Sequence, residues 1–287
     1  RTDMKHNFLA DTDSGRLARS LAGLRAQTLP ATAWECLVVD NASTPAVGLP
    51  VEAGPNFRLV CEATPGLSSA RRRGLRESAG ELCVFVDDDN VLASDYLAHA
   101  VRLASAHPRV GAFGGRSLPA FETPPPNWAP EFFDLLALRD PGPQSLIAPA
   151  ETPPRAYPLC APIGAGMVLH RTAAQQWLDS PETGLTDRRG RELTSGGDND
   201  IVLTVFSHGW DVAYFPELQL KHLIPTSRLD PGYLARLNRG IQKSWVQVLA
   251  RHQLSPGSNI PAWTLAPRLA KAWLAHRAWS GPAARIR

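Results

Sequence analysis

Short apolar runs alternate with amphipathic stretches along the first 115 residues of the chain. The apolar runs are rich in Val, Leu and Phe, which pack well in strands buried on both faces of a sheet. The stretches between them repeat leucine and alanine at helical spacing, as Leu17, Leu21 and Leu24 do. We predict strands at 36–39, 57–60, 82–86 and 110–115, and helices at 16–26, 67–79 and 96–106. This alternation predicts a parallel sheet covered by helices on both faces.

The pattern changes after residue 118. Residues 119–158 combine many prolines with aromatic side chains such as Trp128, so we expect an ordered irregular segment rather than a disordered linker. A Trp face can bind a sugar ring, although a packed core Trp is the commoner case. Further strands are predicted at 163–169, 212–215 and 218–222, a polar loop at 187–197, and helices at 172–178, 200–208, 233–251 and 262–279.

Three consecutive acids, Asp87, Asp88 and Asp89, end the apolar run at 82–86. Three carboxylates cannot be buried without compensation, so the strand is predicted to surface here, at the edge of the sheet where open α/β folds bind ligands. Adjacent carboxylates repel one another unless a cation or hydrogen-bond donors compensate, and hard divalent ions prefer oxygen ligands. The alternative is an acidic turn or a helix cap, since Asp and Asn are common turn residues.

Two further features could carry chemistry, and each also has a structural explanation. Asp198 follows two glycines directly before a predicted helix, where the helix dipole favours a carboxylate, but it could equally be the N-cap. His222 ends a strand-like run. A lone histidine in that position is more often a satisfied structural residue than a ligand.

Composition and charge narrow the class of protein. The chain has 287 residues and a formal net charge of +3, which gives no argument for nucleic-acid binding. The four cysteines (Cys36, Cys61, Cys83 and Cys160) are widely spaced, so we expect reduced thiols rather than a zinc site or disulfides. No window is long enough for a transmembrane helix, and the N-terminal residues lack the apolar core of a signal peptide. These observations predict a reducing, cytoplasmic setting.

The C-terminal segment is basic, with no acidic residue after Asp230. Residues 262–279 alternate Leu and Trp with Arg268, Lys271 and Arg277. Such a helix could lie on an anionic membrane near a lipid-linked acceptor. We favour a helix that packs on the main domain, because its polar face is short and rich in alanine.

Taken together, the motifs resemble those of the family-2 glycosyltransferases of the GT-A fold. In family order, they read VVDNAS, PGLSSARRRGL, FVDDDNVL, GGDND and GWDVAYFPELQLKH, and the resemblance spans about residues 16–237. It implies a Rossmann-like, mostly parallel sheet with helices on both faces, and a helical C-terminal extension. It also implies inverting transfer of a sugar from a nucleotide diphosphate sugar, with UDP favoured, to a glycan or lipid-linked hydroxyl. The implied cofactor is Mn²⁺ or Mg²⁺.

The resemblance also assigns roles and boundaries. It implies a GT-A domain at 1–230, with a nucleotide-binding half at about 1–118 and an acceptor half at 119–230, followed by an extension at 231–287. The implied roles are nucleobase contact for Asp40, nucleotide binding for Arg71, ribose contact for Asp87, sugar contact for Asp88, metal binding for Asp89 and His222, and general base for Asp198.

Two departures from the family pattern keep other functions open. Residues 5–12 stand where the family has a strongly apolar first strand, and they are poor strand material. Gly197 stands where many members carry Glu. A weak first strand would suit a non-catalytic nucleotide-sugar binding or scaffold protein. A sugar nucleotidyltransferase is less favoured, because it would need a basic, glycine-rich phosphate loop after that strand, and none is visible.

Overall fold

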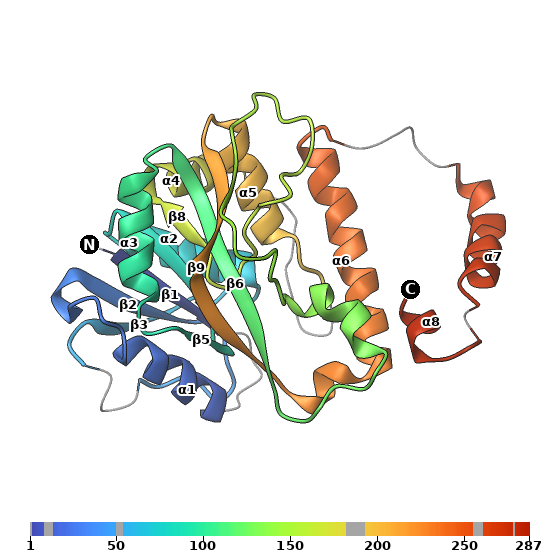
Figure 1. Cartoon of the computed structure of the whole chain (residues 1–287), viewed down its shortest axis with the longest axis horizontal. Coiled ribbons are helices and arrows are strands. Elements are labelled where there is room, and N and C mark those ends of the chain that lie inside the picture. Colours follow the sequence, from blue (N-terminus) through green and yellow to red (C-terminus); the bar gives the residue numbers. More distant parts are fainter. Residues whose placement is uncertain (1, 9–13, 50–53, 182–192, 255–260, 278) are drawn as a thin grey trace.

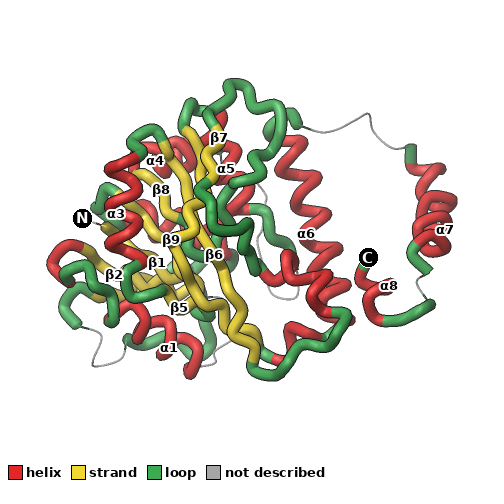
Figure 2. The backbone as a smooth tube through the Cα atoms, in the orientation of Figure 1, coloured by secondary structure: helices red, strands yellow, loops and turns green. Residues whose placement is uncertain are grey.

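A computed structural model describes residues 2–8, 14–49, 54–181, 193–254, 261–277 and 279–287. Its centre is a nine-stranded sheet in the order β3-β2-β1-β4-β8-β6-β9-β5, with β7 paired to β9 (Figures 1 and 2). The strands are β1 (Thr2–Phe8), β2 (Trp34–Asp40), β3 (Phe57–Cys61), β4 (Leu82–Asp87), β5 (Asn90–Leu92), β6 (Val110–Phe121), β7 (Leu146–Ala148), β8 (Val168–His170) and β9 (Asp211–Ile224). The β3-β2-β1-β4 block is parallel as predicted, and β5, β7 and β8 pair antiparallel to their neighbours.

Helices cover both faces of this sheet, which explains why its strands are apolar at consecutive positions. In β4, Val84 and Val86 pack toward α1 and α3, whereas Cys83 and Phe85 pack toward α4 and α5. A strand buried on both faces has no polar alternation. The helices are α1 (Ser14–Arg25), α2 (Leu67–Glu77), α3 (Tyr96–Ala106), α4 (Arg171–Asp179), α5 (Gly197–Ser207), α6 (Pro231–Arg251), α7 (Leu265–Ala275) and α8 (Pro282–Ile286).

The first strand is present in spite of its unfavourable sequence. β1 lies between β2 and β4 and pairs in parallel with both, so that Lys5 stands opposite Leu37 on one side and Phe85 on the other. Backbone hydrogen bonds to two strongly apolar strands do not depend on the side-chain pattern of β1 itself. Residues 5–8, which the sequence marked as poor strand material, therefore do form part of a strand, while residues 9–12 of the matched segment lie outside the described residues.

The strands around the middle of the sheet differ from prediction in extent. β9 is one strand rather than two, because pairing with the long β6 continues past Pro216 through a register shift between Gly114 and Arg116. A Cβ on Gly115 would lie 1.9 Å from the carbonyl oxygen of Leu218, so this close approach requires glycine. β8 begins only at Val168, because 163–167 form a turn before it. Most of the polar loop predicted at 187–197 lies outside the described residues.

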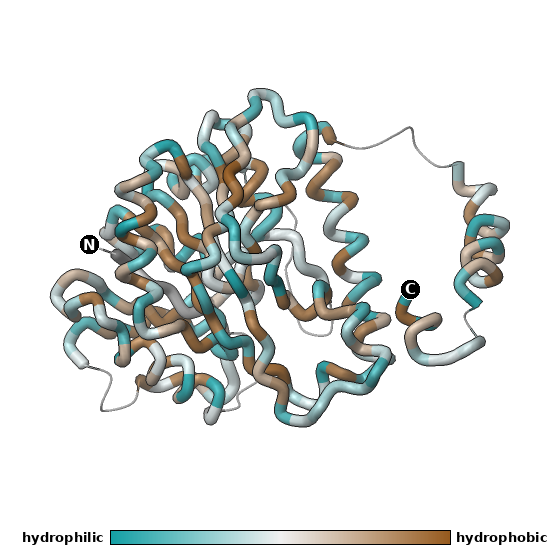
Figure 3. Tube along the Cα trace, in the orientation of Figure 1, coloured by the Kyte–Doolittle hydropathy of each residue, from teal (hydrophilic) through white to brown (hydrophobic). Residues whose placement is uncertain are grey.

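The C-terminal extension divides into a docked part and an exposed part. α6 packs beside the short helix Ala129–Leu136, and α8 joins this cluster through the buried Ile286. Trp128 is half-buried in the same cluster, with its ring 6.2 Å from that of Phe132, so it serves as packing. α7 stands away from the sheet, and no residue of it is buried, although it carries hydrophobic residues (Figures 1 and 3). The expectation that this helix packs on the main domain is wrong.

The four cysteines are free, as predicted, and three of them are buried. Cys36 and Cys83 lie inside β2 and β4. Burial raises the pKa of the Cys36 thiol far above its usual value, which keeps the thiol protonated. These residues therefore act as small core side chains.

Candidate active site

Asp87, Asp88 and Asp89 form a turn at the carboxyl end of β4, and the side chain of Asn90 fixes the shape of that turn. Asn90 accepts a hydrogen bond from the backbone N–H of Asp87 at 3.2 Å and donates one to Asp89 Oδ1 at 3.0 Å. Ser20 Oγ, from α1, donates to the carbonyl oxygen of Asn90 at 2.6 Å. The turn is thereby held rigidly against α1 at the sheet edge where the sequence predicted it.

Asp89 is buried and lies beside two nitrogen-bearing side chains. Its Oδ2 atom is 3.0 Å from Nη2 of Arg228 and 3.2 Å from Nε2 of His222. The antiparallel pairing of β5 with β9 sets Asn90 opposite His222, and the N–H of Leu223 donates to the carbonyl oxygen of Asp89 at 2.7 Å. The structure therefore brings together two of the sequence-predicted site residues, Asp89 and His222, through tertiary strand pairing.

The side chains beside Asp89 suit a divalent cation. His222 is buried, and neither of its ring nitrogens makes a hydrogen bond, although Nε2 lies 3.2 Å from Asp89 Oδ2. A carboxylate oxygen and an imidazole nitrogen at one point are suitable first ligands for Mn²⁺ or Mg²⁺, and such ions are commonly held by one or two carboxylates plus substrate phosphates. Within the described ranges no three His, Cys, Asp or Glu side chains cluster as a complete metal site. Asp89 and His222 are thus at most a partial ligand set for such an ion.

The pKa of Asp88 is raised by its position in the acidic turn. Burial, followed by the charges of Asp89 and Asp87, raises its pKa to about 7, although Arg16 and Arg228 act in the opposite direction. The usual value for an aspartate is about 4. Additional positive charge near this turn would therefore be stabilised by all three carboxylates.

Asp198 lies in the first turn of α5 and faces the loop before β8. The N-cap of α5 is Gly196, so the alternative that Asp198 itself is the N-cap is wrong. Asp198 Oδ2 accepts a hydrogen bond from the N–H of Gly164 at 3.0 Å, and Oδ1 accepts from the N–H of Asn199 at 3.0 Å. These two contacts hold the carboxylate in one orientation at the start of α5.

Arg71, on α2, lies against the same loop at Gly164. It is buried on α2, with its guanidinium carbon 5.0 Å from the centre of the Phe85 ring. A Cβ on Gly164 would lie 2.2 Å from Arg71 Nη2, so any other residue at 164 would displace the guanidinium from this position. Gly164 thus contacts Asp198 through its N–H and Arg71 through its α-carbon, and it joins these two predicted residues at one point.

Asp40 ends β2, and both of its carboxylate oxygens bind the loop that follows. Oδ1 accepts from the N–H of Ser43 at 3.0 Å, and Oδ2 accepts from the N–H of Val47 at 3.2 Å. The neighbouring Asn41, which the sequence reasoning missed, donates to the carbonyl oxygens of Glu62 and Thr64. These bonds shape the rim of the sheet beside α2, and Asp40 acts here as a loop-forming residue.

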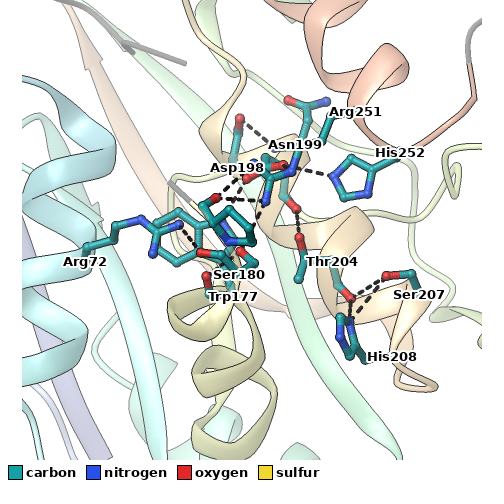
Figure 4. A network of polar contacts seen from close by, with 12 residues as sticks. Arg72, Trp177, Ser180, Asp198, Asn199, Thr204, Ser207, His208, Arg251 and His252 are labelled. Atoms are coloured by element: carbon teal, nitrogen blue, oxygen red, sulfur yellow. Dashed lines mark hydrogen bonds and ion pairs between the residues drawn. The ribbon is translucent and has the colours of Figure 1, made fainter. Parts of the chain in front are cut away.

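A buried network missed in the sequence holds the helix that carries Asp198 (Figure 4). Asp200 is 2% exposed and accepts a hydrogen bond from Trp177 Nε1 at 2.9 Å. Its other oxygen lies 2.9 Å from His252 Nε2 and 3.1 Å from Arg251 Nε. Asp200 therefore ties α5 to α4 and to the end of α6, and the only sequence signal for it is the acid two residues after Asp198.

The protonation of Asp200 follows from this network. Burial by itself would raise the pKa of the carboxyl, but hydrogen bonds from His252 and Trp177 and the charge of Arg251 hold it below its usual value. The ionised form is thus the one that the folded protein prefers. Its contribution to stability is present above the unfolded pKa of about 4 and is lost as pH falls through the folded pKa.

Asp200→Asn is expected to lower the free energy of unfolding at pH 7 by about 3–5 kcal/mol, the usual cost of removing one partner of a buried ion pair. Urea unfolding followed by circular dichroism measures the loss, with Asp179→Asn as the control, because Asp179 is exposed and accepts its hydrogen bond from the exposed Gln175. The difference between wild type and Asp200→Asn should shrink below pH 4. Equal stability of the two proteins at pH 7 would contradict this account.

Comparisons with known proteins agree with this architecture. The sequence model described as "Glycosyl transferase family 2" matches residues 13–176, which is more than half of the chain. The TarS 1–349 structure from S. aureus aligns over 96% of this chain and 80% of its own, with 14% identity and a TM-score of 0.52. A mannosyltransferase from Pyrobaculum calidifontis, in complex with GDP-Man and Mn²⁺, aligns over 99% and 72%, with 20% identity and a TM-score of 0.58. No curated protein matches the chain.

The sheet topology and these structural likenesses define a GT-A glycosyltransferase fold with a helical C-terminal extension. The chain belongs to glycosyl transferase family 2. The resemblance drawn from its motifs is therefore confirmed, as is the fold class.

Proposed function

We propose that the chain transfers a hexose unit from a nucleotide diphosphate sugar to a glycan or lipid-linked hydroxyl, with a divalent cation and with inversion. The observation that carries the proposal is the convergence of Asp89 and His222 at the edge of the sheet, with Nε2 3.2 Å from Asp89 Oδ2 and neither imidazole nitrogen hydrogen-bonded. Supporting it, a similar mannosyltransferase structure contains GDP-Man and Mn²⁺, and a TarS structure contains UDP-GlcNAc.

Asp89 and His222 would hold the Mn²⁺ or Mg²⁺ ion. When bound, such an ion offsets the negative charge of the diphosphate leaving group. The other residues bind and orient the donor: Asp87 faces the ribose, Asp88 the sugar, Asp40 the base, and Arg71 the nucleotide. The position of Arg71 beside Gly164 supports this, because it sets a guanidinium near the carboxylate that acts on the acceptor.

Asp198 acts as the general base. A carboxylate oxygen of Asp198 takes the proton of the acceptor hydroxyl while the acceptor oxygen bonds to the anomeric carbon. The bond from that carbon to the diphosphate breaks at the same time, and its electron pair leaves with the nucleotide. A single displacement of this kind inverts the anomeric centre. The hydrogen bonds from Gly164 and Asn199 support the proposal by holding the carboxylate in one orientation.

A non-catalytic nucleotide-sugar binding protein is the second candidate, and the fold weakens its case. Its main support was an unfavourable first strand, yet β1 pairs with both neighbours over its length. A sugar nucleotidyltransferase is disfavoured by membership of the transferase family. The scaffold function would also leave the fixed orientation of Asp198 without a purpose.

Calorimetric titration of UDP, GDP and dTDP into the protein, first with Mn²⁺ and then with EDTA, tests the proposal. We expect at least one nucleotide to bind at least tenfold more tightly with Mn²⁺, because the diphosphate completes the ligand set of Asp89 and His222. UDP is the nucleotide that we expect to bind. The nucleotide that binds then selects the sugars for a transfer assay. Absence of binding by all three in both conditions would overturn the proposed function.

A further inference from the structure

The surface of α7 is unusually apolar for an exposed helix. Its large side chains and those of the flanking turns are 55–81% exposed, and the rings of Trp273 and Trp279 lie 4.8 Å apart. We call this surface the α7 face, and its members are Trp263, Leu265, Leu269, Trp273, Leu274 and Trp279. Leu265, Leu269 and Trp273 recur at four-residue spacing and so share one side of α7. Large exposed apolar patches usually mark an interaction site.

Positive charge accompanies the α7 face. Arg268 and Lys271 project from the same helix, are exposed, and lie one turn apart. The sequence has no acidic residue after Asp230, so nothing acidic on the extension offsets them. A partner that complements this surface therefore carries both apolar groups and negative charge.

A second copy of the chain fits this combination poorly. In a twofold dimer the same patch meets itself, which would gather the positive charges of both copies at one interface with no acidic residue of the extension between them. An anionic phospholipid surface offers acyl chains to Leu and Trp and phosphate groups to Arg and Lys. Tryptophan is particularly suited to that boundary, because its ring is apolar while its N–H can bond at the headgroup level.

We propose that the α7 face binds the surface of an anionic phospholipid bilayer, with α7 lying in the plane of the interface. The helix has 11 residues. Among the described helices none is long and apolar enough to cross a membrane. Where the proposed sugar transfer also holds, this contact brings the active site to a lipid-linked acceptor. The contact itself requires no step of that reaction, so the two proposals can fail separately.

Flotation of the full chain with vesicles tests the contact. With vesicles of phosphatidylcholine and phosphatidylglycerol (3:1), we expect binding that weakens between 50 and 500 mM NaCl, and little binding to pure phosphatidylcholine. Arg268→Glu with Lys271→Glu should reduce binding by about tenfold or more. Trp263→Ser with Trp273→Ser should also reduce it, through lost apolar contact. Because these side chains are exposed, the circular dichroism spectrum should stay unchanged.

The matched control is Arg102→Glu with Arg109→Glu, which changes the net charge equally beside α3, at the opposite end of the molecule (Figure 1). We expect it to keep vesicle binding within about twofold, since charge near a membrane acts over roughly one Debye length. Equal loss in the control, equal binding to both vesicle types, or no binding would overturn the proposal. A dimer that light scattering detects and that the tryptophan variant dissociates would also overturn it. Unchanged nucleotide titration of the α7 variants separates this result from the proposed sugar transfer.

Discussion

Asp198→Asn is expected to lower sugar transfer by about 10²–10⁴-fold while nucleotide binding stays unchanged. The amide keeps the size of the carboxylate, and its oxygen can still accept the hydrogen bond from the Gly164 N–H that wild-type Oδ2 accepts at 3.0 Å. What it loses is the ability to take a proton from the acceptor hydroxyl. The measurement is the rate of transfer from the donor selected by titration, alongside calorimetry with the same nucleotide.

Asp179→Asn is the matched control, because it makes the same change at an exposed position on α4. It should leave both turnover and binding as in the wild type. An Asp198→Asn protein that transfers sugar at the wild-type rate would remove Asp198 from the chemistry. If neither the wild type nor the variant turns over any donor while both bind nucleotide, the non-catalytic function would replace transfer.

Asp89→Asn is expected to abolish the dependence of nucleotide binding on Mn²⁺. The affinity for Mn²⁺ should fall by more than the roughly 10–100-fold that removing an outer-shell partner costs at a metal site. An amide oxygen is a weaker ligand than a carboxylate, and Arg228, 3.0 Å from Asp89 Oδ2, would lose its counter-charge. The variant still offers its side-chain oxygen to Asn90, so the turn should keep its shape. Titration with Mn²⁺ and with EDTA should then give equal affinities.

Asp95→Asn serves as the control for this change. Asp95 precedes α3 at an exposed position and makes no capping bond with its side chain, so metal dependence should persist. Asp89→Ala, which also removes the bond to Asn90, should behave like Asp89→Asn if the loss is one of cation binding. Retention of metal-dependent affinity in Asp89→Asn would mean that other residues hold the cation.

Much of the fold could be predicted, because local pattern and burial agreed. β4 was predicted to surface at Asp87, and its fully buried run does end there, but Asp89 is buried again because Arg228 lies beside its carboxylate. The helix predicted at 96–106 has the bounds of α3. The prediction failed where pairing outweighed pattern, as in β1, which two strong neighbours hold in the sheet, and in β9, which continues through Pro216.

The candidate site was predictable in its residue types but not in its partners. Asp89, Asp198 and His222 stand in motifs that can be read along the chain. Arg228 stands in no such motif, and its importance comes from the distant Asp89. Asp200 ends the GGDND motif, but nothing in that motif indicates that it contacts Trp177 and His252. A contact between distant segments leaves no local period to detect.

The amino-acid sequence by itself determined the α/β class, the edge of the sheet where the acids emerge, and the family to which the chain belongs. Those properties follow from local hydrophobic period and from short motifs, which neighbouring residues specify. Only the tertiary structure decided that residues 2–8 pair between β2 and β4, that Arg228 and His222 both lie beside Asp89, that Gly164 contacts both Arg71 and Asp198, and that α7 stands exposed. Each of these depends on which distant segments pack together, and that is settled by the whole fold.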